Sequence, residues 1–216
     1  MRRRLSRLSV VCAVVASTLA AATVTSGPAS AFPKGDPVFS FKYKVVATTH
    51  IKRENLTITA GPGLFQGGID LATGQLKGSI SLPNTTFTQS EEGIGLVTAT
   101  SATVATKPVT GTVNIGTLKV TSTSTFNIHI LSMYPAIPDP PKPLPPSPKV
   151  NLVGGGCSTQ QPISVTMSGK ANLSGSSTFK GVFTIPDFVN CGVMTQVINQ
   201  EIPGPGNTFT ATASPA

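Results

Sequence analysis

The 216-residue sequence contains no tryptophan, two tyrosines and only 8 acidic residues. With 6% aromatic residues and no arginine-rich stripe, it lacks the stacking platforms and the basic track of a nucleic-acid interface, so we expect no nucleic-acid partner. The few carboxylates also argue against a glycoside hydrolase, which needs an opposed pair. Glu91 and Glu92 are adjacent and diverge in an extended segment, whereas Asp70 and Asp187 follow predicted strands and fit turn or capping roles.

The sequence also lacks catalytic and metal-binding motifs. The two histidines, His50 and His129, lie on the polar sides of predicted strands, and there is no G-x-S-x-G nucleophile elbow. No H-x-x-x-H, C-x-x-C or acidic calcium loop is present either. We therefore predict a protein that is not an enzyme and uses no cofactor or metal. A hydrolase that uses His129 or His50 ranks third, after the two non-enzymatic roles described below.

The first 31 residues have the layout of a secretory signal peptide. Four arginines precede an apolar stretch at 8–22, and the small residues Ala29-Ser30-Ala31 form an A-x-A cleavage site. The apolar stretch is shorter than the roughly 20 residues that a membrane span needs, and no such run occurs later, so we expect no transmembrane helix. Ser6 and Arg7 stand where a twin-arginine signal prefers apolar residues, which favours ordinary secretion over that route.

Most of the positive charge belongs to this leader and to the segment just after it. Beyond residue 31 the chain keeps 12 basic residues against 8 acidic ones. Five of the basic residues cluster near the predicted new N-terminus: Lys34, Lys42, Lys44, Lys52 and Arg53. We interpret them as solvated charge on an edge strand, which prevents sheet-to-sheet association. The alternative is a contact with an anionic polymer or lipid of the cell envelope.

Two of the three cysteines, Cys157 and Cys191, follow the leader. An even pair in an exported chain predicts a disulfide, because the compartment is oxidising. With a sequence separation of 34 between the two cysteines, the bond would stabilise the fold by about 3–4 kcal/mol. Two free thiols are the alternative, and a metal pair is disfavoured because no histidine is near either cysteine in the sequence.

Alternation of apolar and polar residues indicates β-structure nearly throughout the rest of the chain. The pattern is clear at 41–51 and clearest at 118–132, where every second residue is apolar over much of the segment. We expect further strands at 55–60, 64–70, 75–82, 94–106, 109–116, 163–173, 178–185 and 207–213. Turn signals separate several of them: Gly61-Pro62-Gly63, Thr73-Gly74, Lys107-Pro108 and Ser174-Gly175.

Many short strands with such punctuation predict an all-β fold, either a two-sheet sandwich or a flattened barrel. One short C-terminal helix is expected, with Asn190 as its cap and apolar residues at helical spacing. These apolar residues are Val193, Met194, Val197, Ile198 and Ile202. Pro203-Gly204-Pro205-Gly206 ends the helix.

Residues 135–148 contain eight prolines, which favours an extended course without ladder hydrogen bonds. We interpret the segment as a connecting excursion within one domain, 32–216, because the residues after it are too few to fold well alone. A domain linker or a proline-rich docking site are the alternatives.

A weak internal repeat relates segment 76–84 to segment 179–187. Both read apolar, Lys, Gly, any residue, apolar, hydroxyl, apolar, Pro, then Asn or Asp. The similarity indicates either two related halves of one sheet assembly or chance in a sequence of low complexity.

The sequence resembles a family of secreted, β-rich actinobacterial proteins with no established activity. The resemblance rests on Thr123-Ser124-Thr125-Phe126-Asn127-Ile128, the stretch 157–163, the segment 185–192 around Cys191, and the closing segment 203–208. It supplies no catalytic residues. A looser similarity to the lipid-binding YceI-type barrels rests on β composition and on Gly68-Ile69-Asp70.

Taken together, the sequence predicts an exported, non-enzymatic protein of the extracellular space or the cell envelope. Its predicted role is binding or structural contact at the envelope. The alternative is a carrier of an apolar ligand, held in a barrel or between two sheets.

Overall fold

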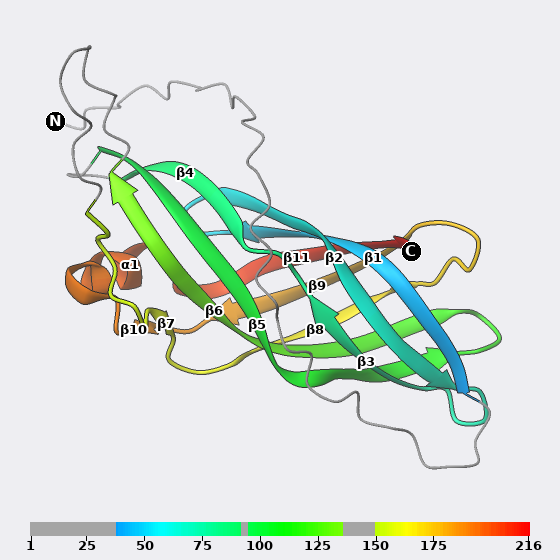
Figure 1. Ribbon diagram of the computed structural model, residues 1–216. Helices are drawn as coiled ribbons and strands as arrows, with labels where there is room; N and C mark the ends of the chain where they lie inside the picture. Colours follow the sequence, from blue (N-terminus) through cyan, green and yellow to red (C-terminus); the bar gives the residue numbers. More distant parts are fainter. Residues whose placement is uncertain (1–37, 92–94, 136–149) are drawn as a thin grey trace, which may run out of the picture.

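The computed structural model of the protein describes residues 38–91, 95–135 and 150–216 (Figure 1). The predicted signal peptide 1–31 lies outside these residues, as does the proline-rich segment 135–148 apart from Pro135. The strands are β1 (Val38–Ile51), β2 (Leu56–Asp70), β3 (Gln75–Ser81), β4 (Thr85–Glu91), β5 (Gly95–Asn114), β6 (Lys119–Pro135), β7 (Ser158–Thr159), β8 (Ile163–Lys170), β9 (Ser177–Ile185), β10 (Phe188–Val189) and β11 (Gly204–Pro215). The α-helix α1 spans Thr195–Glu201 and follows the 3₁₀ turn η1 at Gly192–Met194.

A single antiparallel sheet closes on itself. Around the ring the order is β1-β2-β3-β5-β6-β8-β9-β11, and β11 pairs back with β1 from Tyr43–Pro215 to His50–Thr208. The long pairing of β5 with β6 joins the two halves of the ring. The all-β prediction is therefore confirmed in the form of an eight-stranded barrel, and the two-sheet sandwich is wrong. β4, β7 and β10 add to the sheet outside the ring.

The predicted alternation of apolar and hydroxyl residues explains this closure. Along β6, every second residue from Val120 to Phe126 is buried, including Ser122 and Ser124, and Ile130 is buried further along; Thr121, Thr123 and Thr125 alternate with them and are exposed or partly exposed. On the outer surface, threonines of neighbouring strands contact each other, as in the 3.1 Å hydrogen bond between the hydroxyls of Thr123 and Thr166. Closing the sheet buries one face and leaves the polar face in water.

Two predicted breaks are bends within continuous strands. The expected strands 55–60 and 64–70 form the single strand β2, with a register shift opposite Val45 and Ala47. Likewise, 94–106 and 109–116 fall largely within the single strand β5, which shifts register around Lys107. The turns predicted at Gly61-Pro62-Gly63 and Lys107-Pro108 are therefore wrong, because these residues form irregularities that curve a strand without ending it.

Charge on β1 also needs a different interpretation. β1 pairs with β11 on one side and with β2 on the other, so it is not an edge strand. The basic residues predicted to cluster are separated along β1: Lys42 and Lys44 lie in its first half, whereas Lys52 and Arg53 follow its end. Lys34 lies outside the described residues. The edge-strand interpretation of these charges is wrong.

One end of the barrel carries the short helix and the disulfide. Figure 1 shows α1, β7 and β10 together at this end, opposite the turns that join β2 to β3, β5 to β6 and β8 to β9. The predicted bond between Cys157 and Cys191 is present and ties the loop before β7 to the start of η1. Phe188 at this end is fully buried, and Asn199 of α1 fixes its backbone with two hydrogen bonds.

The helix differs from the prediction at its start. Asn190 has a positive φ of 60° and is not the cap; Cys191 takes that position, with no side-chain capping hydrogen bond. Val193 is 84% exposed, whereas Met194 and Ile198 are buried as expected. The turn at Gly192 rotates Val193 away from the core, so the helical stripe begins one residue later than the sequence pattern indicates.

The two halves of the ring have the same connectivity. β1-β2-β3-β5 and β6-β8-β9-β11 are each a four-stranded antiparallel meander, and corresponding strands lie opposite each other in the ring. The repeated segments 76–84 and 179–187 coincide with β3 and β9, the third strands of the two halves. Descent of the halves from one duplicated unit stays a prediction.

Candidate ligand-binding cavity

The barrel interior is packed at the helix end and hollow at the other. A large cluster of buried side chains fills the packed part, in which the rings of Phe126 and Phe183 meet edge to face at 6.3 Å. A cavity of about 230 Å³ occupies the opposite end. All eight ring strands contribute side chains to its wall, which identifies it as the barrel lumen.

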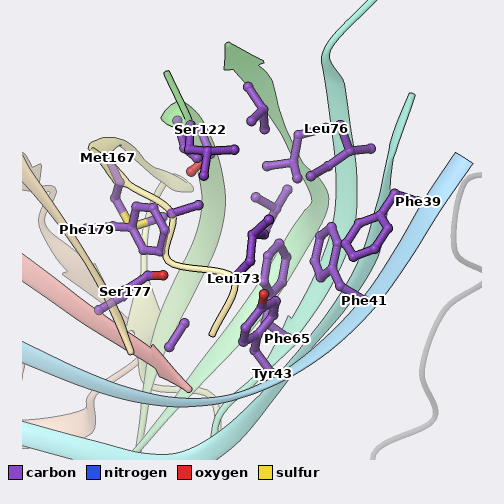
Figure 2. Close-up of a pocket in the computed structure, with 18 of the residues that line it drawn as sticks. Phe39, Phe41, Tyr43, Phe65, Leu76, Ser122, Met167, Leu173, Ser177 and Phe179 are labelled. Atoms are coloured by element: carbon purple, nitrogen blue, oxygen red, sulfur yellow. The ribbon is translucent and has the colours of Figure 1, made fainter. Parts of the chain in front are cut away.

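Three aromatic residues form one wall of the cavity, which we call the aromatic wall: Phe41 and Tyr43 of β1 and Phe65 of β2. The ring centroids of Phe41 and Phe65 lie 5.3 Å apart, and those of Phe41 and Tyr43 lie 5.7 Å apart. Figure 2 shows this wall on one side of the cavity, with Met167 and Phe179 on the other. Tilted aromatic contacts of this kind hold the rings in place.

The floor of the cavity is the top of the packed core. Val45, Met167, Ala211 and Ala213 line the cavity and belong to the large core cluster at the same time. A smaller cluster of buried Leu76, Val113 and Val120 lies beside it in the wall. The alanines of β11 are small, so the strand leaves space here that larger side chains would fill.

The mouth of the cavity carries exposed apolar side chains. Leu71, Ile115 and Leu173 lie in the turns after β2, β5 and β8, and Phe39 lies at the start of β1. They are 47%, 45%, 59% and 46% exposed, respectively. We call these four residues the rim. Because they are part of the cavity lining and also face water, the cavity opens to solvent between them.

Polar groups in the cavity wall are few. Ser177 is buried, and its hydroxyl accepts a 2.8 Å hydrogen bond from the backbone N–H of Asn172, so it serves the β8–β9 turn. Ser122 and the Tyr43 phenol are the other side-chain polar groups among the described lining residues. No Asp, Glu, Lys, Arg or His of the described chain lines the cavity.

Asp70 supports the mouth without lining it. Its carboxylate accepts hydrogen bonds from the backbone N–H groups of Ala72 (2.8 Å) and Thr73 (3.1 Å) and from the Thr73 hydroxyl (2.7 Å). The hydrogen bond from the Thr73 hydroxyl is the main cause that lowers the pKa of Asp70, aided by the backbone donors. The predicted turn role of Asp70 is thereby confirmed, and the turn holds Leu71 at the rim.

The structure does not bring the sequence-predicted reactive residues together. His50 lies on β1 and makes a 3.2 Å hydrogen bond between its Nδ1 and the Thr57 hydroxyl. His129 lies on β6, opposite β1 in the ring, and pairs with Ser158. Cys157 and Cys191 lie at the packed end and form the disulfide.

Sequence reasoning gave a ligand-carrying barrel only as an alternative and identified none of the residues that line the cavity, although the strands that form it were predicted. Its lining residues have the same apolar character as core residues, and they are spread from Phe39 to Ala213. The small residues Ala211 and Ala213 at inward positions of one strand are the only sequence signal that favours a void there.

Within the described residues, no helix has the length and apolar character needed to cross a bilayer. No three His, Cys, Asp or Glu side chains in those same ranges are grouped so that they could share a metal ion. Comparison of the chain with protein-family models, with curated proteins and with solved structures finds no match. The resemblances to a secreted actinobacterial family and to YceI-type barrels stay predictions.

Proposed function

We propose that the protein binds a neutral, apolar small molecule in the open end of its barrel and acts as a carrier or receptor for it outside the cytoplasm. The observation that carries this proposal is the solvent-open cavity of about 230 Å³ with an almost wholly apolar wall. Eight-stranded barrels have room either for side chains alone or for one small ligand. A protein that only makes structural contacts at the envelope needs no such cavity, so we place ligand binding first.

The energetics favour an apolar occupant. Each CH₂ group that leaves water for the cavity contributes about 0.8 kcal/mol to binding. An apolar cavity of about 150 Å³ in another protein stays dry and binds benzene, and the present cavity is larger. A charged group inside would find no oppositely charged side chain among the described lining residues, so an ionised ligand would keep its charge at the mouth.

Export and the absence of catalysis belong to the same proposal. The disulfide between Cys157 and Cys191 supports an oxidising location, as the predicted signal peptide does. The separated positions of His50 and His129 in the ring support a binding role over hydrolysis. Under this proposal, the protein carries its ligand without changing it chemically.

Fluorescence titration with N-phenylnaphthylamine, an uncharged apolar probe, tests the proposal. We expect saturable binding of one probe per protein. Ala213→Phe places a ring in the cavity and should weaken binding by about tenfold or more, or about 1.4 kcal/mol. Thr212→Phe is the matched control, because Thr212 is the exposed neighbour on the same strand, and it should leave affinity within about twofold.

Native mass spectrometry of the gently purified protein complements the titration, with a co-purifying apolar molecule as the expected result. Absence of saturable probe binding by the folded wild-type protein would contradict the proposal. So would undiminished binding by a folded Ala213→Phe variant.

A further inference from the structure

Each of the three turns around the cavity mouth contributes one large apolar side chain to the rim. Leu71, Ile115 and Leu173 come from three separate turns that lie at one end of the barrel (Figure 1), and Figure 2 shows Leu173 and Phe39 among the side chains around the cavity. Exposing four large apolar side chains around one opening costs free energy in water. A ring of apolar tips that can enter the boundary between lipid headgroups and acyl chains removes this cost.

Positive charge lies directly behind the rim. Lys119 at the start of β6 and Lys170 at the end of β8 are cross-strand partners on the outer surface. Lys180 of β9 is partnered with Ser168, two residues from Lys170 on β8. Like charges placed opposite each other in a sheet destabilise it, and neither Lys119 nor Lys170 forms an ion pair with a described residue. An anionic surface would relieve this repulsion.

Acidic residues are concentrated at the far end. Of the five acidic residues in the described chain, Glu54, Glu91, Asp187 and Glu201 lie at or near the packed end, in the connections or at the ends of elements there. Only Asp70 lies near the mouth, and its carboxylate accepts hydrogen bonds from Ala72 and Thr73 of its own turn. Lys52 and Arg53 share the far end with the other four carboxylates, so acidic residues outnumber basic ones there, whereas Lys119 and Lys170 lie at the open end; the barrel is therefore polarised, with excess positive charge at the end that opens.

We propose that the open end of the barrel docks on the surface of an anionic lipid bilayer. The rim enters the headgroup boundary, and Lys119, Lys170 and Lys180 contact the anionic headgroups. Docking would place the cavity mouth against the membrane, so the apolar ligand would pass between bilayer and barrel without crossing water. This last step rests on the proposed function, whereas docking itself does not.

Vesicle sedimentation tests the docking. The full secreted protein is mixed with vesicles of phosphatidylcholine alone or of phosphatidylcholine with phosphatidylglycerol. We expect binding to the vesicles with phosphatidylglycerol, and weaker binding at high salt, because salt screens exposed charges. Equal binding to both vesicle types, or no binding to either, would overturn the proposal.

Two sets of variants separate the contributions of the rim and the lysines. The triple variant Leu71→Ser, Ile115→Ser, Leu173→Ser and the double variant Lys119→Glu, Lys170→Glu should each reduce vesicle binding by about tenfold or more. Val193→Ser removes an exposed apolar residue at the packed end, and Lys52→Glu with Lys107→Glu makes the same charge change away from the mouth. Both controls should bind vesicles like the wild type, and equal losses in the controls would overturn the proposal.

The same variants distinguish failure of docking from failure of ligand binding. The lysine variant should still bind N-phenylnaphthylamine in solution, because neither Lys119 nor Lys170 lines the cavity, whereas Ala213→Phe should bind the probe more weakly and keep vesicle binding. Light scattering in solution measures the oligomeric state and so tests whether the rim instead binds a second copy of the chain. A dimer that the triple rim variant dissociates would show that the rim is a subunit interface and would overturn membrane docking.

Discussion

The ring of Phe65 leaves no room for a side chain at Gly78 on the neighbouring strand. A Cβ atom at Gly78 would come within 2.7 Å of the Phe65 ring and within 2.7 Å of the Gln66 carbonyl oxygen. Phe65 belongs to the aromatic wall of the cavity, so the absence of a side chain at Gly78 helps to set the shape of that wall. Because the carbonyl oxygen is backbone, it cannot move aside without bending β2.

Gly78→Ala should therefore destabilise the fold and alter the cavity together. We expect the free energy of unfolding to fall by about 1–3 kcal/mol, the usual cost of overpacking a tight site. The displaced Phe65 ring should also weaken binding of N-phenylnaphthylamine. Denaturant unfolding and the fluorescence titration measure the two effects.

Gly155→Ala is the control, since a Cβ at Gly155 meets nothing within 4 Å. It should change neither stability nor probe affinity. Equal stability of the Gly78 and Gly155 variants would contradict the prediction, because it would show that Phe65 and β2 can shift to accommodate a side chain at Gly78.

Removing the disulfide should act on stability alone. Cys157→Ser with Cys191→Ser opens a loop of sequence separation 34 and should lower the free energy of unfolding by about 3–4 kcal/mol. The cavity lies at the other end of the barrel, so the folded variant should bind the probe like the wild type. Denaturant unfolding with and without a reducing agent is the measurement, and a reduced wild type should match the double variant. Unchanged stability on reduction would contradict this prediction.

The turn at Asp70 should make part of the stability depend on pH. Folding lowers the pKa of Asp70 through the Thr73 hydroxyl, so the ionised form is favoured in the folded state. The resulting stabilisation is complete above the ordinary carboxyl pKa of about 3.9 and is lost as the pH falls through the lower pKa of the folded state.

Asp70→Asn should accordingly be less stable than the wild type near neutral pH, and the difference should shrink as the solution becomes acidic. Denaturant unfolding at a series of pH values checks this. A difference that stays constant down to strongly acidic pH would indicate that the charge of Asp70 has no part in holding the turn.

Much of the fold could be predicted from local sequence patterns. Alternation at 118–132 identified β6, and the even pair of cysteines identified the Cys157–Cys191 disulfide. These features depend on neighbouring residues or on a simple count. The turns at Thr73-Gly74 and Ser174-Gly175 were also recognised, because glycine and small polar residues favour a reversal between two alternating segments.

Each sequence-based prediction that was wrong has a physical cause. Lys107-Pro108 has the composition of a turn, but pairing with β6 on both sides of it keeps β5 continuous through a register shift. Asn190 is a good capping residue by type, yet the disulfide at the adjacent Cys191 and the backbone turn there move the helix start. Tertiary constraints outweighed local preference at both positions.

By itself, the sequence determined that this chain forms strands with an apolar face and a hydroxyl-rich face, because side chains alternate along extended backbone. Only the tertiary structure decided that the sheet closes, since closure depends on pairing residues as far apart as Tyr43 and Pro215. It also decided that the lumen is filled at one end and open at the other. That outcome depends on how side-chain volumes from eight strands add up at each level of the barrel, which no single segment specifies.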